Sequence, residues 1–167
     1  MRNLKVKLRL LLLPTFIILS TYFSFAQQAF DKSNNGVVVH VRSVAPGSAK
    51  TVKLQVVNDN IIRVSTIPGD DFSNDTSLII VYKNNGNNQF TTEQNGDTVY
   101  LKTNTLTVRI STNNGSVSFT KSDGTPILQE KRTAEPTFTT AVFDGQPLYH
   151  INQTFQTTDD DAWYGLG

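Results

Sequence analysis

This sequence predicts an all-β fold, an antiparallel sandwich or barrel. Apolar and polar residues alternate with period two in many short runs, as they do in strands with one buried face. Asn, Gly, Asp and Pro cluster between these runs, where turns are needed. Beyond residue 27, Thr, Asn, Val, Ile and Phe dominate, whereas Ala, Leu and Glu are scarce. That composition favours strands over helices.

The first predicted strand, at 36–44, places Val37, Val39 and Val41 on one face, and the turn residues Pro-Gly-Ser at 46–48 end it. The next two strands flank an Asn-Asp-Asn turn at 58–60. We expect a tight hairpin there, because Asn and Asp tolerate the positive φ that tight turns need. These two strands are predicted at 51–57 and 61–66.

The rest of the chain continues as short strands between turn signals. Asn-Gly-containing turns separate several of them, and Asp-Gly pairs at 123–124 and 144–145 mark two further turns. About ten strands are expected in total, and no stretch after the leader has a convincing helical period. The predicted strands in this part are 78–82, 90–93, 98–102, 105–111, 117–121, 127–131, 138–143 and 148–155.

The first 26 residues form a different kind of segment. Four basic residues within positions 2–9 precede a mostly apolar stretch, and Ser24-Phe25-Ala26 offers the pattern that a signal peptidase accepts. The stretch is nearly long enough for a transmembrane anchor, but Pro14 and several hydroxyl side chains interrupt it. We therefore expect 1–26 to be a helical signal peptide that is cleaved, so that the protein is exported to the periplasm or the cell exterior without remaining in the membrane.

Charge and cysteine content narrow the function classes. The chain has 15 Lys and Arg, four of them in the leader, so residues 27–167 hold 11 against 14 Asp and Glu, a net charge of −3. No Lys/Arg-dense patch remains for nucleic acid. The absence of Cys excludes disulfides and suggests an exported bacterial protein stabilised by its core alone. Residues 27–167 suffice for one domain.

Side chains suited to catalysis or metal binding are few. His40 and His150 stand 110 positions apart in alternating strand patterns and are interpreted as packing or surface residues. The acidic clusters at 70–71 and 159–161 lack the spaced oxygen ligands of a calcium loop and are interpreted as solvated loops. No phosphate-binding glycine loop is present. We therefore predict no catalytic, cofactor-binding or metal-binding residue, and no cofactor.

The last five residues are the most informative part of the sequence. Aromatic rings beside glycines suit a sugar-binding loop, although a pair of core aromatics would have the same spacing. An exposed Trp-Tyr pair would leave a large apolar area in water, so we expect further polypeptide to follow in the intact protein. The residues concerned are Trp163, Tyr164, Gly165, Leu166 and Gly167.

Two segments carry a resemblance to a known family. Residues 157–167, TTDDDAWYGLG, resemble the segment that closes the N-terminal β-sandwich of glycoside hydrolase family 31. Residues 52–64, VKLQVVNDNIIRV, resemble an early hairpin of the same domain in bacterial α-xylosidase-like and α-glucosidase-like members. The two segments lie in the expected order, and the resemblance covers most of residues 30–167.

The resemblance implies a galactose-mutarotase-like sandwich packed on a catalytic (β/α)8 barrel. It implies a retaining mechanism with two barrel aspartates, whose carboxyl groups lie about 5 Å apart. Because that barrel would begin after Gly167, no catalytic residue can be assigned in this chain. Only the last five residues carry over, as a domain junction. The intact protein is expected to release α-linked glucose or xylose from oligosaccharides, which the missing barrel would bind.

Two other functions stay open at this point. A free-standing sugar-binding sandwich would need exposed aromatic residues gathered on one concave face. An immunoglobulin-like module of a cell-surface protein would share the fold class, since sandwiches host many functions.

Overall fold

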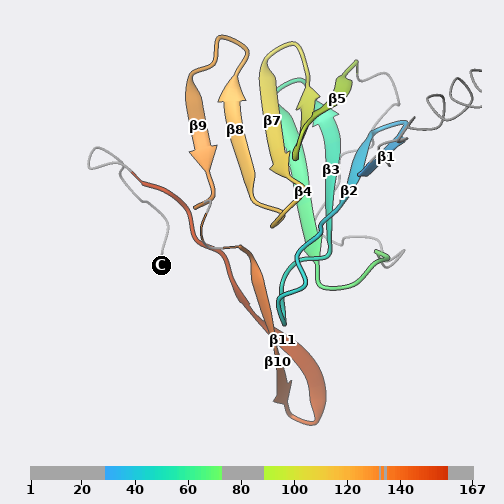
Figure 1. Ribbon diagram of the computed structural model, residues 1–167, viewed down its shortest axis with the longest axis vertical. Helices are drawn as coiled ribbons and strands as arrows, with labels where there is room; N and C mark the ends of the chain where they lie inside the picture. The colour runs from blue at the N-terminus through green and yellow to red at the C-terminus, as the bar shows by residue number, and fades with distance from the viewer. Residues whose placement is uncertain (1–28, 73–88, 132, 134, 158–167) are drawn as a thin grey trace, which may run out of the picture.

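The structure is a computed structural model that describes residues 29–72, 89–131, 133 and 135–157. These residues form eleven strands, all paired antiparallel, and no helix (Figure 1). The predicted all-β antiparallel class is confirmed, with eleven strands against about ten expected. The expected leader at 1–26, the strand at 78–82 and the terminal segment from 158 lie outside the described residues.

Two sheets and one separate hairpin make up the domain. The four-stranded sheet has the order β1-β2-β3-β4, with β1 Phe30–Ser33, β2 Gly36–His40, β3 Thr51–Asn58 and β4 Ile61–Ile67. The five-stranded sheet has the order β5-β6-β7-β8-β9, with β5 Thr91–Asn95, β6 Thr98–Lys102, β7 Leu106–Ser111, β8 Val117–Lys121 and β9 Pro126–Gln129. The hairpin consists of β10 Thr137–Phe143 and β11 Gln146–Asn152.

One hydrophobic core lies between the two sheets. Alternate residues of the strands point inward, as the period-two pattern predicts, and both sheets contribute. Leu54 of β3 and Leu101 of β6 are almost fully buried. Sheet-to-sheet packing of this kind defines a β-sandwich. The buried cluster consists of Phe30, Val37, Val39, Val52, Leu54, Val56, Val99, Leu101, Val108, Ile110 and Val117.

Polar contacts join the sheets at one end of the sandwich, at the β3–β4 turn. The backbone carbonyl of Asp59 accepts hydrogen bonds from the hydroxyls of Thr103 (2.8 Å) and Thr105 in the β6–β7 connection. The Asp59 carboxylate also accepts from Nδ2 of Asn104 at 2.7 Å. We call these four residues the Asp59 clamp. It fixes one end of the two sheets against each other.

A second set of contacts joins the opposite end. The Arg42 guanidinium donates to Oδ1 of Asp97 at 2.7 Å, and its backbone N–H donates to the carbonyl of Thr112 at 2.8 Å. Nδ2 of Asn113 donates to the other carboxylate oxygen of Asp97 at 3.2 Å. The side-chain hydrogen bonds from Arg42, which has the larger effect, and from Asn113 lower the pKa of Asp97. The sheets are thus tied together at both ends.

Several strand and turn predictions need correction. Strand β1 was not predicted, because it is a short edge strand whose four residues include one apolar side chain. Strand β2 ends at His40 rather than at 44, since the Arg42 N–H leaves the sheet to bond Thr112. The 58–60 turn uses a bulge after Val56 and an N–H bond from Asn60 to the Asn58 side chain. Positive φ among described non-glycine residues occurs at Asp144 alone.

The β10–β11 hairpin projects from one end of the sandwich (Figure 1). Its turn consists of Asp144 (φ 49°) and Gly145 (φ 73°), as the Asp-Gly pair predicts. Strand β11 begins at Gln146 rather than at the predicted 148 and ends at Asn152 rather than at 155. Two consecutive positive φ values suit the twist of a tight hairpin. At its base the Phe138 N–H donates to Gly47 O at 2.7 Å, and Phe138 is buried.

Candidate functional site

The two histidines lie apart from each other. Nε2 of His40 is 2.8 Å from Oδ2 of Asp31, on the exposed side of the paired strands β1 and β2. His150 is exposed on strand β11. Within residues 29–72, 89–131, 133 and 135–157, no group of three or more His, Cys, Asp or Glu side chains could hold a metal ion.

The acidic pair at 70–71 follows strand β4. The carbonyls of Gly69 and Asp70 accept a hydrogen bond from the buried Thr51 hydroxyl, at 2.8 Å and 3.2 Å. This segment is therefore bonded to the first residue of β3 through its backbone. The other predicted cluster, 159–161, lies outside the described residues, as do Trp163, Tyr164, Gly165, Leu166 and Gly167.

A polar row crosses the outer face of the five-stranded sheet. The strand register aligns five residues, one from each of the strands β5 to β9, and each lies directly opposite the next. Within it Nε of Arg109 donates to Oγ of Ser118 at 3.2 Å. The row consists of Glu93, Tyr100, Arg109, Ser118 and Gln129.

A pocket of about 180 Å³ lies along this row and is lined by all of its residues except Glu93, with Glu130 as a buried carboxylate in its lining. Oε2 of Glu130 accepts the backbone N–H of Val117 at 3.0 Å, and Oε1 accepts from the amide of Gln153. Burial raises the pKa of Glu130, while these two hydrogen bonds oppose the rise. The lining residues are Thr98, Tyr100, Arg109, Ser111, Ser116, Val117, Ser118, Gln129 and Glu130.

The bonding of Glu130 indicates a structural role. Both of its oxygens bind groups of the protein itself, and backbone bonds beside it join 129–131 to 154–156. Retaining hydrolysis needs two carboxyl groups about 5 Å apart, and Glu130 is the one carboxylate that lines this pocket. The pocket is also smaller than the roughly 300–1,000 Å³ of most ligand sites. Sequence reasoning did not single out Glu130, since it ends a run of ordinary alternation.

A wider groove of about 750 Å³ lies beside the β1–β2 turn. Its two lysines already have partners. Nζ of Lys32 lies 5.1 Å from the ring centroid of Phe90, and Nζ of Lys102 lies 2.5 Å from Oε1 of Glu93. Gln89, at the limit of the described residues, also lines the groove. These contacts indicate a packed polar edge, with no arrangement for a defined reaction.

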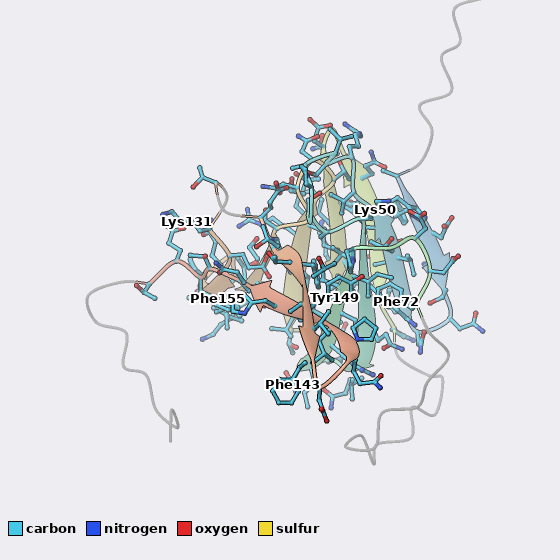
Figure 2. The ribbon with its side chains drawn as sticks, turned by 90° about the horizontal axis from the view of Figure 1, so that it is seen from below. Lys50, Phe72, Lys131, Phe143, Tyr149 and Phe155 are labelled. Atoms are coloured by element: carbon cyan, nitrogen blue, oxygen red, sulfur yellow. The ribbon has the colours of Figure 1, made fainter. Side chains whose placement is uncertain are left out.

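Among the described residues, the largest group of exposed apolar side chains lies on the β10–β11 hairpin. Figure 2 labels Phe143 and Tyr149 on this hairpin, which are 74% and 54% exposed. Exposed aromatic residues thus gather on a projecting hairpin rather than on a concave sheet face. In the described part of the chain, no helix has the length and apolar character needed to cross a membrane.

These features define the described residues as an antiparallel β-sandwich domain with one hydrophobic core and polar contacts that join the two sheets at both ends. The family model described as the glycosyl hydrolase 31 N-terminal galactose mutarotase-like domain matches residues 51–167. The chain belongs to this family. The resemblance drawn from 52–64 and 157–167 is confirmed, and membership supersedes the immunoglobulin-like interpretation.

Two solved proteins share this architecture. The GH31 α-xylosidase of Xanthomonas citri is 37% identical, with a TM-score of 0.65, over 77% of this chain and 14% of that enzyme. An uncharacterized protein of Listeria monocytogenes EGD-e, solved alone and with glucose, magnesium and calcium, matches with a TM-score of 0.62. It is 18% identical over 84% of this chain and 12% of its own length, which shows the fold alone. This chain therefore spans a small part of both relatives.

Proposed function

We propose that this chain is the N-terminal, non-catalytic sandwich domain of an exported, retaining α-glycosidase. The enzyme would release α-linked glucose or xylose from the non-reducing ends of oligosaccharides. The observation that carries the proposal is family membership over residues 51–167, together with 37% identity to an α-xylosidase. Residues 1–26 would direct export as a signal peptide.

The size of the α-xylosidase indicates which functions this chain would have and which the rest of the polypeptide would have. Because 77% of this chain matches 14% of the α-xylosidase, most of that enzyme has no counterpart here. We place the two catalytic carboxylates and the oligosaccharide site in that further polypeptide. The sandwich would then support the catalytic domain. Trp163 to Gly167 would lie at their junction.

The test compares two purified proteins on p-nitrophenyl α-xyloside and α-glucoside. Residues 27–167 are expected to show no turnover, and the full polypeptide encoded by the gene is expected to hydrolyse at least one substrate. The sugar released first should keep the α-configuration when followed by NMR. Turnover by residues 27–167, or a full polypeptide without glycosidase activity, would contradict the proposal.

A second candidate is a sugar-binding module that uses one aromatic ring rather than an aromatic face, since Tyr100, Arg109 and Gln129 line the same pocket. Calorimetry of residues 27–167 with malto- and xylogluco-oligosaccharides separates the two. Binding at millimolar or tighter affinity that Tyr100→Ala abolishes would support this second function. Injection heats no larger than the heat of dilution would exclude the sugar-binding function.

A further inference from the structure

The β10–β11 hairpin has one strongly apolar face. Residues directly opposite in an antiparallel pair share a face, and successive residues alternate between the two faces. Val142, Ile151 and Tyr149 on this face are 76%, 61% and 54% exposed. We call it the hairpin apolar face. Its members are Phe138, Thr140, Val142, Pro147, Tyr149 and Ile151.

The opposite face of the same hairpin is more polar. Five of its eight residues are Thr, Gln, His or Asn, and all positions from 139 to 152 are exposed. Asp144, in the turn, is the one Asp, Glu, Lys or Arg between 137 and 152. The apolar face therefore carries no charge that would keep it in water. This opposite face consists of Thr137, Thr139, Ala141, Phe143, Gln146, Leu148, His150 and Asn152.

Within the described part of the chain, contacts with the sandwich cover only the base of the hairpin, where Thr137 and Phe138 meet Ser48 and Gly47. Phe138 is 7% exposed and meets the Tyr149 ring edge-to-face at 6.0 Å. Beyond this anchor both strands are solvent-exposed (Figures 1 and 2). A two-stranded hairpin alone is marginal in water, and an apolar patch on the order of several hundred Å² marks an interaction surface.

We propose that the hairpin apolar face is the surface on which the rest of the glycosidase polypeptide packs. This inference rests on the proposed function. In the α-xylosidase a matching domain belongs to a polypeptide several times longer, so a large covalently attached partner is at hand. Attachment gives a neighbouring domain an effective concentration of about millimolar. A second copy of the chain at micromolar concentration is about a thousandfold more dilute than this attached partner. The attached partner therefore occupies the hairpin apolar face, which has no charges that would select a second copy.

The experiment measures amide hydrogen exchange in residues 137–152, in the 27–167 chain and in the full polypeptide. Slower exchange by about tenfold or more is expected in the full polypeptide. The double variant Val142→Glu/Ile151→Glu, which keeps the Phe138–Tyr149 ring contact, is expected to remove this protection. The control Thr139→Glu/Gln146→Glu, on the opposite face, is expected to retain it. All four positions are exposed, so the thermal midpoint of the 27–167 chain should move by about 2 °C or less in either variant.

The outcomes separate this inference from the proposed function. A full polypeptide that hydrolyses an α-glycoside but exchanges its hairpin as fast as the 27–167 chain overturns the docking surface and leaves the function standing. Equal loss of protection in both double variants also overturns it. Protection in the 27–167 chain that grows with protein concentration, with a doubled mass in sedimentation, assigns the face to a second copy instead.

Discussion

At Gly36, strand β2 approaches β3 too closely for any side chain. A Cβ atom there would lie 1.8 Å from the backbone oxygen of Leu54. Gly36→Ala should therefore force the strands apart and cost about 3 kcal/mol of unfolding free energy, as overpacking against an immobile backbone does. Urea denaturation measures the loss.

Gly69→Ala is the matched control, since nothing lies within 4 Å of the added atom. It should change stability by about 0.5 kcal/mol or less. Equal unfolding midpoints for the two variants would mean that the strands separate freely at Gly36.

Glu130 gives the fold a pH dependence of defined sign. Burial raises its pKa above the ordinary 4.5, so between the unfolded and folded pKa values the native state binds more protons. The contribution of Glu130 is thus largest at low pH and is lost as pH rises through its folded pKa. Urea denaturation in steps from pH 4 to 8 should show this component, and Glu130→Gln should remove it.

Loss of an acceptor also lowers the stability of Glu130→Gln by about 1–3 kcal/mol at every pH. The role of Glu130 is therefore diagnosed by how steeply the free energy of unfolding changes with pH, and not by its absolute value. Asp71→Asn, at an exposed carboxylate, serves as control. A wild-type slope unchanged in Glu130→Gln would show that Glu130 does not titrate in this window.

Among the elements, the β6–β7 connection does more than reverse the chain. The Thr103 hydroxyl donates to Asp59 O and accepts the Leu106 N–H at 3.0 Å. Thr103→Val should leave both groups without that partner and cost about 1–3 kcal/mol, measured by thermal unfolding. Thr91→Val, exposed on edge strand β5, should change stability little. A neutral Thr103→Val would show that the Asp59 clamp is dispensable.

Sequence patterns located most elements because one face of each strand meets the core. The strands at 98–102 and 117–121 match β6 and β8 at both ends. Local sequence does not encode where a strand changes partners, as β2 does after His40, nor an edge strand with one apolar residue, as in β1. The sequence predicted the family to which the chain belongs, but it predicted no residue of the pocket around Glu130. Glu130 acquires its character from Val117 and Gln153, which are 13 and 23 positions away.

At the scale of the whole molecule, the sandwich should unfold as one cooperative unit. Leu54 and Leu101 come from different sheets but belong to the same core. Leu54→Ala and Leu101→Ala should each cost about 2–5 kcal/mol and shift a single transition. Circular dichroism and amide hydrogen exchange should report the same unfolding midpoint. Two separated transitions in either variant would show that the sheets fold independently.

The Asp59 clamp also determines where foreign sequence can be inserted in this domain. The β3–β4 turn is occupied by bonds to the other sheet, so a peptide inserted at 59–60 would separate the sheets at that end. The β8–β9 turn is bonded to the β6–β7 connection only at its start, where the Ser122 N–H donates to Thr105 O at 2.9 Å. Among the described contacts, its tip at 123–124 is bonded only to Lys121 and Thr125, and nothing lies within 4 Å of a Cβ on Gly124. An epitope tag placed at 123–124 should therefore leave the melting temperature nearly unchanged, making that turn the position for labelling this domain.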